Sequence, residues 1–368
     1  MYKVLIVFNH PAPYKVKLFN ELSKYIDLTV IFEREKASDR NKSFYDEKEY
    51  KFKQVKIKGI NLGKENIISS GVKKHLKHNK YDLIIMNGYS QFSEMSAINY
   101  LIKNKIPYTL YINGGIIRNK ESSVRRKLKR KYISHASNYF SPDENSNNYL
   151  VFYGADPAKI YNYPYSTIFA KEILPVPYEQ LEKLEMRNNS DVHEEKIFVS
   201  CGQLIKRKNY FELIKRWQEI NPKYGLYIIG DGPQKEMLQK YIDDNRIQNV
   251  HLIGYMSRKE MFNFYHLSDT FIFPSDEDIY GHVINEAMSQ GLPVISTPNV
   301  NASRKLIKNS YNGFIISSLE NDELKIAVEN TLKTKMAKNA IATSYENTIE
   351  KMVEAHLEIL KGIMEKWI

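Results

Sequence analysis

Short apolar runs alternate with helical patterns along both halves of the chain. In the first half, runs rich in β-branched residues lie at 3–8, 28–32, 82–86 and 107–112. In the second half they lie at 196–201, 225–229, 250–253, 269–273 and 292–296. Near-continuous apolar strands separated by helices are typical of parallel sheets covered on both faces. The pattern predicts an α/β protein with two doubly wound sheets, since 368 residues suit two domains better than one core.

The polar segment 171–195, which contains two prolines, divides the two series of strands and helices. We interpret it as a linker between a first domain over 1–170 and a second domain over 196–342. Apolar residues recur at helical spacing near the end of the chain, which predicts a helix within 343–368. We expect this helix to pack on the body of the protein, and the first domain is one surface to which it can return.

The composition excludes several classes of protein. A hydrophobic content of 42% is ordinary for a globular protein, and no window approaches about 18 uninterrupted apolar residues, so no membrane span is predicted. Cys201 is the single cysteine, which excludes an internal disulfide and a cysteine-based zinc site. We expect a cytoplasmic protein, because a reducing compartment suits a chain without disulfides.

Positive charge is concentrated in the first half of the chain. Residues 1–170 carry 29 Lys and Arg against 15 Asp and Glu, whereas residues 171–368 carry 25 against 28. The run 118–131 holds eight cations and one Glu, which favours contact with an anionic membrane surface. Nucleic acid is not expected as a partner, because aromatic residues are sparse within the run. Solubility and a solvated helix face remain open as alternatives. The cations expected at the membrane are Arg125, Arg126, Lys127, Lys129, Arg130 and Lys131.

The segment 273–296 is the most informative part of the sequence. Asp278 precedes Gly281, a helical run begins near His282, and Glu286 follows on that run. The start of a helix binds anions through its free N–H groups, and carboxylates accept hydrogen bonds from sugar hydroxyls. Phosphate and sugar recognition in one segment indicates a nucleotide sugar. The alternative is a surface loop followed by an amphipathic helix, with Glu286 merely solvated.

Three further turns follow strands in the second half. Gly202 begins a turn with Lys206, Arg207 and Lys208, whose cations can hold a diphosphate or form a solvated loop. The turn 230–233 lacks the third glycine of a dinucleotide fingerprint, and a tight turn is an equally good interpretation. The turn 254–256 offers an aromatic ring and backbone groups to a flat base.

The order of these landmarks resembles the C-terminal domain of the group 1 retaining glycosyltransferases of the GT-B fold. The resemblance covers about residues 196–316. Its landmarks are Gly202 to Lys208, Gly230 to Pro233, Gly254-Tyr255, Pro274-Ser275, Asp278 to Glu286 with Tyr280-Gly281 inside, and Gly291 to Ile295. It implies two Rossmann-like domains that face each other across a cleft. Two departures are visible, because Asp278 stands where the family has a Glu and Gln203 where it has an Arg.

The resemblance also implies roles for individual residues. Lys208 would stabilise the diphosphate, Glu286 would hold the ribose hydroxyls, and Asp278 would bind the donor sugar; we expect these three to be catalytic. No metal and no cofactor are expected, and the nucleotide sugar is a substrate, with UDP as the default. The donor-binding residues implied are Gly202, Gln203, Arg207, Lys208, Gly230, Gly232, Tyr255, Met256, Asp278, Gly281, His282, Val283 and Glu286.

Acceptor recognition is expected at the ends of strands in the first half. Asn9, His10 and Tyr14 follow the first strand in a loop stiffened by prolines, and Asn113 and Gly114 follow the strand near 107–112. His10 is as readily a capping or packing group as a site residue. No general base can be assigned, and the leaving phosphate can take the acceptor proton in its place.

These observations predict a retaining, metal-independent hexosyltransferase that moves a sugar from a nucleotide sugar to a glycan hydroxyl. Its expected product is a bacterial capsule, another cell-surface polysaccharide or a lipid-linked oligosaccharide, made at the inner face of the cell membrane. Two alternatives remain. One is a nucleotide-sugar epimerase or phosphorylase on the same fold, and the other is a non-catalytic basic protein that binds membrane or nucleic acid.

Overall fold

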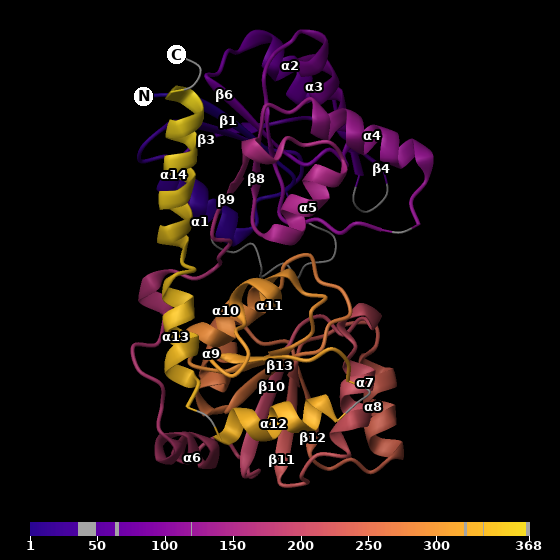
Figure 1. Ribbon diagram of the computed structural model, residues 1–368, viewed down its shortest axis with the longest axis vertical. Coiled ribbons are helices and arrows are strands. Elements are labelled where there is room, and N and C mark those ends of the chain that lie inside the picture. Colours follow the sequence, from indigo (N-terminus) through magenta and orange to yellow (C-terminus); the bar gives the residue numbers. More distant parts are fainter. Residues whose placement is uncertain (36–48, 63–65, 119, 320–321, 334, 366–368) are drawn as a thin grey trace. The chain divides into compact units, whose positions relative to one another are not determined.

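The computed structural model describes residues 1–35, 49–62, 66–118, 120–319, 322–333 and 335–365. The chain divides into two compact units (Figure 1). The first unit comprises Met1–Tyr165 together with Ile349–Ile368, and the second comprises Ser166–Thr348. Each unit is a parallel sheet with helices packed against it.

The first unit is built on a seven-stranded sheet in the order β3-β2-β1-β6-β7-β8-β9, in which every neighbouring pair is parallel. A separate antiparallel pair, β4 and β5, adds a short hairpin. The strands are β1 Lys3–Phe8, β2 Asp27–Phe32, β3 Lys53–Lys56, β4 Ile60–Leu62, β5 Asn66–Ile68, β6 Leu83–Asn87, β7 Thr109–Tyr111, β8 Asn138–Ser141 and β9 Ile160–Asn162. The helices are α1 Pro13–Leu22, α2 Gly71–His78, α3 Phe92–Lys103, α4 Ser123–Ser134, α5 Glu144–Phe152 and α14 Ile349–Glu365.

The second unit has a six-stranded parallel sheet in the order β12-β11-β10-β13-β14-β15. Counted within this unit, the order is that of a Rossmann sheet, and it reverses between β10 and β13. The strands are β10 Lys196–Cys201, β11 Tyr224–Ile229, β12 Val250–Gly254, β13 Thr270–Phe273, β14 Val294–Ser296 and β15 Gly313–Ile315. The helices are α6 Gln180–Asn188, α7 Tyr210–Trp217, α8 Lys235–Asp244, α9 Arg258–Leu267, α10 His282–Ser289, α11 Asn301–Leu306, α12 Glu323–Lys333 and α13 Ala337–Tyr345.

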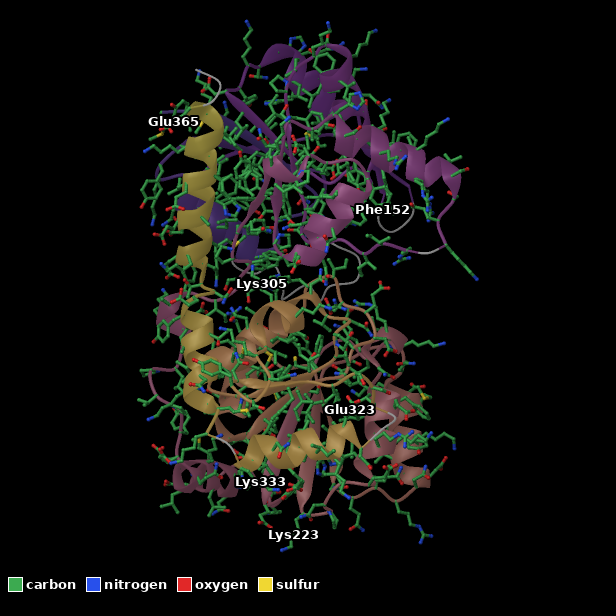
Figure 2. The ribbon with its side chains drawn as sticks, viewed as in Figure 1. Phe152, Lys223, Lys305, Glu323, Lys333 and Glu365 are labelled. Atoms are coloured by element: carbon green, nitrogen blue, oxygen red, sulfur yellow. The ribbon has the colours of Figure 1, made fainter. Side chains whose placement is uncertain are left out.

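The apolar runs predicted as strands all form strands, because side chains on both faces of a parallel sheet are buried. Several short strands were not predicted, among them β8, β9 and β15. β8 reads NYFS and β15 reads GFI, so neither has the run of β-branched residues that marks the central strands. Charged side chains such as Lys223, Lys333 and Glu365 lie on the outside of the units (Figure 2).

The segment predicted as a linker, 171–195, differs from that expectation because it is packed into the second unit. Its helix α6 buries Arg187, whose Nη2 lies 2.6 Å from Oδ2 of Asp269. Arg187 also donates to the backbone oxygens of Leu267 at 2.9 Å and Glu195 at 2.9 Å. A polar sequence therefore became part of a folded unit through a buried ion pair with a residue far along the chain.

The helix predicted within 343–368 is α14, and it begins later than expected because the preceding helix, α13, extends into the start of this segment. α13 ends at Tyr345, and α14 begins at Ile349. Asn347 lies in the break, and its backbone oxygen accepts a hydrogen bond of 2.8 Å from Nδ2 of the buried Asn285. α14, drawn in yellow, then runs beside α1 of the first unit (Figure 1).

Candidate active site

A buried ion pair lies at the carboxyl edge of the second sheet. Lys208 ends a short 3-10 helix, Lys206–Lys208, that follows β10, and its ammonium donates to Oδ2 of Asp278. The same ammonium lies 4.3 Å from the centre of the Phe273 ring. Arg207 approaches the same carboxylate oxygen at 3.5 Å, while its Nη1 donates to the backbone oxygen of Glu277 at 2.9 Å. Two cations therefore share one carboxylate.

The electrostatics of this pair favour an additional anion. Burial lowers the pKa of Lys208 below its ordinary value, although Asp278 opposes this change. Burial acts to raise the pKa of Asp278, but the charges of Lys208 and Arg207 outweigh it and hold that pKa low. At neutral pH the pair is ionised, with Lys208 largely stripped of water. The Lys208 ammonium has three N–H donors, and one of them is directed to Asp278, so a phosphate oxygen is a suitable further acceptor.

The helix α10 begins at a glycine that no other residue can easily replace. Gly281 precedes the helix with a φ of 95°, in the left-handed region. A Cβ atom added there would lie 2.5 Å from Cγ1 of Val300. This tight turn brings the first backbone N–H groups of α10 to the same loop as Asp278, where the positive end of the helix dipole can face an anion.

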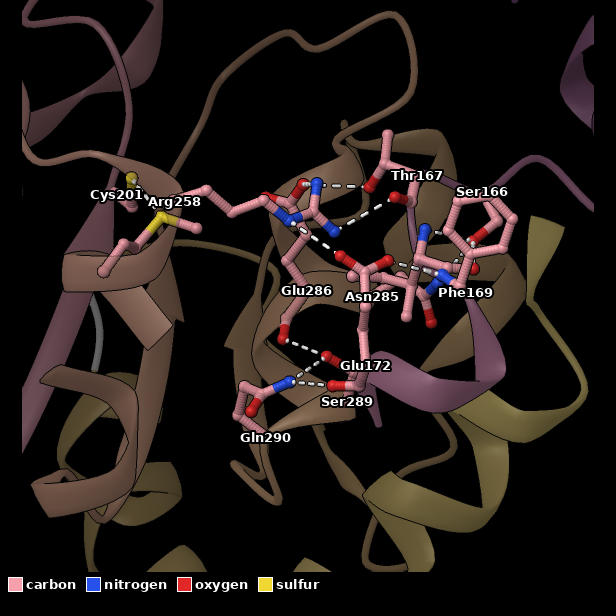
Figure 3. A network of polar contacts seen from close by, with 12 residues as sticks. Ser166, Thr167, Phe169, Glu172, Cys201, Arg258, Asn285, Glu286, Ser289 and Gln290 are labelled. Carbon is pink, nitrogen blue, oxygen red and sulfur yellow. Dashed lines mark hydrogen bonds and ion pairs between the residues drawn. The ribbon is translucent and has the colours of Figure 1, made fainter. Parts of the chain in front are cut away.

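Glu286, on the second turn of α10, is already bound by two side chains (Figure 3). Its Oε1 accepts a hydrogen bond of 2.9 Å from Oγ1 of Thr167 and lies 3.4 Å from Nη1 of Arg258. Arg258 also donates to the backbone oxygen of Thr167 at 3.0 Å and lies 3.6 Å from a carboxylate oxygen of Glu172. Its guanidinium stacks over Phe262 at 5.0 Å. The expected ribose-binding carboxylate is therefore held in place by these two side chains.

Arg258 and Thr167 were not identified from the sequence. Arg258 opens α9 directly after the turn 254–257, and that position is the one signal that could have drawn attention to it. Thr167 lies 91 residues earlier than Arg258, and nothing in its local sequence indicates a site. These two residues become part of the site only through the fold.

The glycine turns predicted for donor binding are brought together by the sheet. The amide of Gly202 donates to the oxygen of Ile229 at 3.0 Å, and that of Gly230 to the oxygen of Gly254 at 2.7 Å. A Cβ at Gly230 would lie 1.9 Å from the oxygen of Gly202, so this glycine is required by packing whatever it binds. Gln203 and Met256 are partly exposed in these turns, and Tyr255 is exposed.

The residues predicted for the acceptor lie at the carboxyl edge of the first sheet. Asn9 and His10 follow β1, and Tyr14, in the first turn of α1, has its hydroxyl 3.1 Å from that of Tyr165. Asn113, which precedes Gly114 after β7, donates from Nδ2 to Oδ1 of Asn87 at 3.0 Å.

The same edge carries a buried carboxyl group that was not predicted from the sequence. Glu33 directly follows β2, and burial raises its pKa to about 7. It accepts a hydrogen bond from Ser93, next to the buried carboxyl of Glu94, whose pKa is raised by burial and by Glu33. A carboxyl group that titrates near neutral pH is typical of functional sites, but it also occurs in structural pairs.

The basic run predicted for a membrane surface forms α4. Arg125, Lys127, Arg130 and Lys131 are exposed on this helix. Lys129 makes contacts inside the first unit, because its ammonium lies 2.6 Å from Glu121 and 4.7 Å from the centre of the Tyr153 ring. Arg126 lies 3.9 Å from the same Glu121. Among the described residues, no helix combines the length and the apolar character needed to cross a bilayer.

The family model for glycosyl transferases group 1 matches residues 182–347. An uncharacterized glycosyltransferase of Methanocaldococcus jannaschii is 28% identical over 251 residues, which is 64% of this chain and 60% of the relative. The lipopolysaccharide core biosynthesis glycosyltransferase LpsE of Rhizobium meliloti is 25% identical over 171 residues, 45% of this chain and 49% of the relative. Both relatives therefore extend well beyond the aligned part.

A solved structure shares the fold over the whole chain. The Anabaena protein HepE in complex with UDP superposes with a TM-score of 0.79 and 17% identity, covering 98% of this chain and 100% of HepE. This similarity confirms the predicted GT-B fold, and the family match confirms the resemblance found in the motifs of the second half. Residues 182–347 of the second unit match the group 1 glycosyltransferases, and the chain has the GT-B fold.

Proposed function

We propose that the protein is a retaining glycosyltransferase that moves a sugar from a UDP-sugar to a hydroxyl group of a glycan. The observation that carries this proposal is the grouping of Lys208, Asp278 and the start of α10 in one loop region, with Glu286 one turn further along the helix. Cations and helix amides suit a diphosphate, and carboxylates suit hydroxyl groups. A nucleotide sugar presents all of these groups in one molecule.

In the proposed reaction, the bond between the sugar and the diphosphate breaks while the acceptor oxygen attacks from the same face. Charge builds on the departing diphosphate, and Lys208 with the α10 amides stabilises that charge without a metal ion. Asp278 binds hydroxyls of the donor sugar, and Glu286 holds the ribose. The acceptor proton passes to a phosphate oxygen of the leaving group, so no separate base is required.

UDP is proposed as the nucleotide because the similar HepE was solved with UDP. A role in polysaccharide or lipopolysaccharide synthesis is proposed because LpsE acts in lipopolysaccharide core biosynthesis. The exposed cations of α4 support work at the cytoplasmic face of an anionic membrane. The acceptor would then be a lipid-linked or membrane-bound glycan.

A screen of nucleotide sugars by mass spectrometry, with and without glycan acceptors, tests the proposal. We expect one UDP-sugar to be consumed and its sugar to appear on an acceptor with retained anomeric configuration. Lys208→Ala should abolish both turnover and UDP binding, since the ammonium is a direct ligand. Lys215→Ala, which removes an exposed cation from α7, is the matched control and should change neither.

Other outcomes of the screen would reject the proposal. Epimerised donor, or donor cleaved by inorganic phosphate without any acceptor, would indicate an epimerase or a phosphorylase. The absence of nucleotide binding would indicate a protein without transferase activity.

A further inference from the structure

A large groove lies on the outside of the first unit, between α2, α3 and α4. Its volume is about 880 Å³, which is within the range of sites for small molecules. Figure 1 shows the three helices at the same end of the unit. Hydrogen bonds join α3 to α4, because Asn99 Nδ2 donates to the Tyr132 hydroxyl at 3.3 Å and Lys131 donates to Asn99 Oδ1 at 2.6 Å. None of the residues expected to bind donor or acceptor lines this groove.

One wall of the groove is apolar and exposed. Phe92, at the start of α3, is 59% exposed, and Leu128 of α4 is 40% exposed. Met95 and Tyr100 continue the wall along α3 and are partly exposed. Neither Phe92 nor Leu128 is among the side chains that form or pack against the buried core of the unit. A contiguous apolar surface of this kind is typical of a binding site.

The rest of the lining is basic. Lys73 and Lys77 of α2 and Lys103 of α3 reach the groove, and no carboxylate is among the described residues that line it. The remaining lining residues are uncharged. The groove therefore combines an apolar wall with three cations, which is the complement of an anionic headgroup joined to a hydrocarbon chain.

We propose that this groove binds one anionic phospholipid molecule of the bilayer. The acyl chain would lie along Phe92, Met95 and Leu128, and the phosphate would be bound by Lys73, Lys77 and Lys103. The stretch of α3 from Phe92 to Lys103 is about 16 Å long, enough for a substantial part of an acyl chain. The inference rests on the membrane contact proposed above, and it adds a defined lipid site to the diffuse charge of α4.

The experiment measures co-sedimentation of the full chain with phosphatidylcholine vesicles, with and without phosphatidylglycerol. We expect binding that requires phosphatidylglycerol and persists in part at high salt. The charge-neutral double variant Phe92→Ser with Leu128→Ser should weaken it about tenfold, and so should Lys73→Ala with Lys77→Ala. The control Lys325→Ala with Lys338→Ala removes two exposed cations from the second unit and should bind like the wild type.

A second variant reports insertion directly. The indole of Phe92→Trp should be quenched by lipids brominated in the acyl chain, because the proposal places that side chain against hydrocarbon. Normal vesicle binding by Phe92→Ser with Leu128→Ser, or indole fluorescence of Phe92→Trp that brominated lipids do not change, would overturn the lipid site and leave only the charge of α4. A wild type that binds no anionic vesicles would overturn both the lipid site and the membrane contact proposed for α4. Donor turnover in solution does not depend on vesicle binding, so it tests the proposed transferase activity separately.

Discussion

Glu286 is bound by Thr167 and Arg258, and these two contacts determine which of its oxygens can bind a ligand. The hydroxyl of Thr167 and the guanidinium of Arg258 both reach Oε1, which leaves Oε2 for a ligand. A carboxylate that is fixed in advance loses less conformational freedom when it binds ribose hydroxyls. We infer that Arg258 is a positioning residue, acting on the nucleotide through Glu286.

Removal of Arg258 should therefore weaken donor binding more than it slows the chemical step. For Arg258→Ala we expect the KM for the donor to rise about tenfold, with a smaller change in kcat. A tenfold rise corresponds to the loss of roughly one hydrogen bond to a charged group. Arg258→Lys should recover part of the affinity. Steady-state kinetics and titration with UDP give the measurement.

Lys259→Ala is the control for this variant, since Lys259 is the exposed neighbour on the same turn of α9. If Arg258→Ala and Lys259→Ala gave the same KM, Arg258 would have no part in donor binding.

The sequence allowed part of this site to be predicted at the residue scale. Asp278 and Lys208 were both expected to bind the donor, and the structure joins them although 70 residues separate them. Each is marked by a local motif next to a glycine turn. Arg258 and Thr167 have no such mark, because their roles depend on contacts between distant segments that no local pattern records.

At the scale of elements, α10 is the feature on which the proposed donor binding depends. Its start is fixed by the left-handed conformation of Gly281 and by the close approach of Val300. Its first turn supplies amides, and its second turn supplies Glu286. A small change in the path of this turn would move all of these groups together.

Two Gly→Ala substitutions should have opposite effects. Gly281→Ala places a Cβ in the left-handed region and against Val300, so we expect a loss of stability of about 1–3 kcal/mol and weaker UDP binding. Gly362 lies within α14, and a Cβ there meets no atom within 4 Å. Gly362→Ala should stabilise the protein by about 0.5–1 kcal/mol without affecting UDP binding.

Thermal unfolding and UDP titration of both variants provide the measurement. A Gly281→Ala protein as stable as the wild type, with unchanged affinity for UDP, would show that the turn is not a constraint.

The strands at the centre of both sheets were predictable as elements, whereas the edge strands β3, β9 and β15 were not, and β12 was the one edge strand that its apolar run marked. β1, β6, β10 and β13 are continuous apolar runs because both of their faces are buried. Strand β3 at the edge of the first sheet reads KQVK, and a pattern of that kind does not distinguish a strand from a loop. This segment becomes a strand because it pairs with β2 in the sheet.

On the scale of the whole molecule, the chain returns to the first unit through α14. A chain of hydrogen bonds lies beneath this helix: buried Lys15 donates to the Tyr111 hydroxyl at 2.8 Å, and that hydroxyl lies 3.3 Å from Nε2 of His356. Nδ1 of His356 lies 2.6 Å from the oxygen of Met352 and must donate to it. Nε2 therefore accepts a hydrogen bond from the Tyr111 hydroxyl, and His356 is neutral.

This chain predicts a pH dependence for α14. Burial, followed by the charge of Lys15, lowers the pKa of His356 to about 3. The unfolded imidazole has a pKa of about 6.5, so below that pH the unfolded state binds a proton that the folded state does not. Acidification therefore favours opening, and stability is lost as the pH falls from about 6.5 towards 3. From about pH 7.5 to about pH 5.5 the opening free energy of α14 should fall by about 1.4 kcal/mol.

Amide hydrogen exchange of α14 in the wild type and in His356→Gln measures this effect. The difference between the two proteins isolates the histidine, because other groups, including Glu33, titrate in both. An equal pH dependence in the two proteins would show that His356 does not contribute.

The alternation of apolar strands and helices was enough to predict two doubly wound domains, and the ordered motifs of the second half implied the GT-B fold by resemblance. The packing of 171–195 into the second unit was not predictable, because the buried Arg187 forms its ion pair with Asp269, which lies 82 residues further along the chain. The polar residues of this segment indicated a linker, but the ion pair with the Asp269 carboxylate makes the segment part of the second unit.

The structure of the protein with a bound UDP-sugar tests the central claim most directly. We predict that the diphosphate lies within hydrogen-bonding distance of Lys208 Nζ and of the first-turn amides of α10, with the ribose hydroxyls on Glu286 and sugar hydroxyls on Asp278. A nucleotide bound elsewhere on the chain, or a complex in which Lys208 remains paired with Asp278 alone and touches no phosphate, would contradict the account.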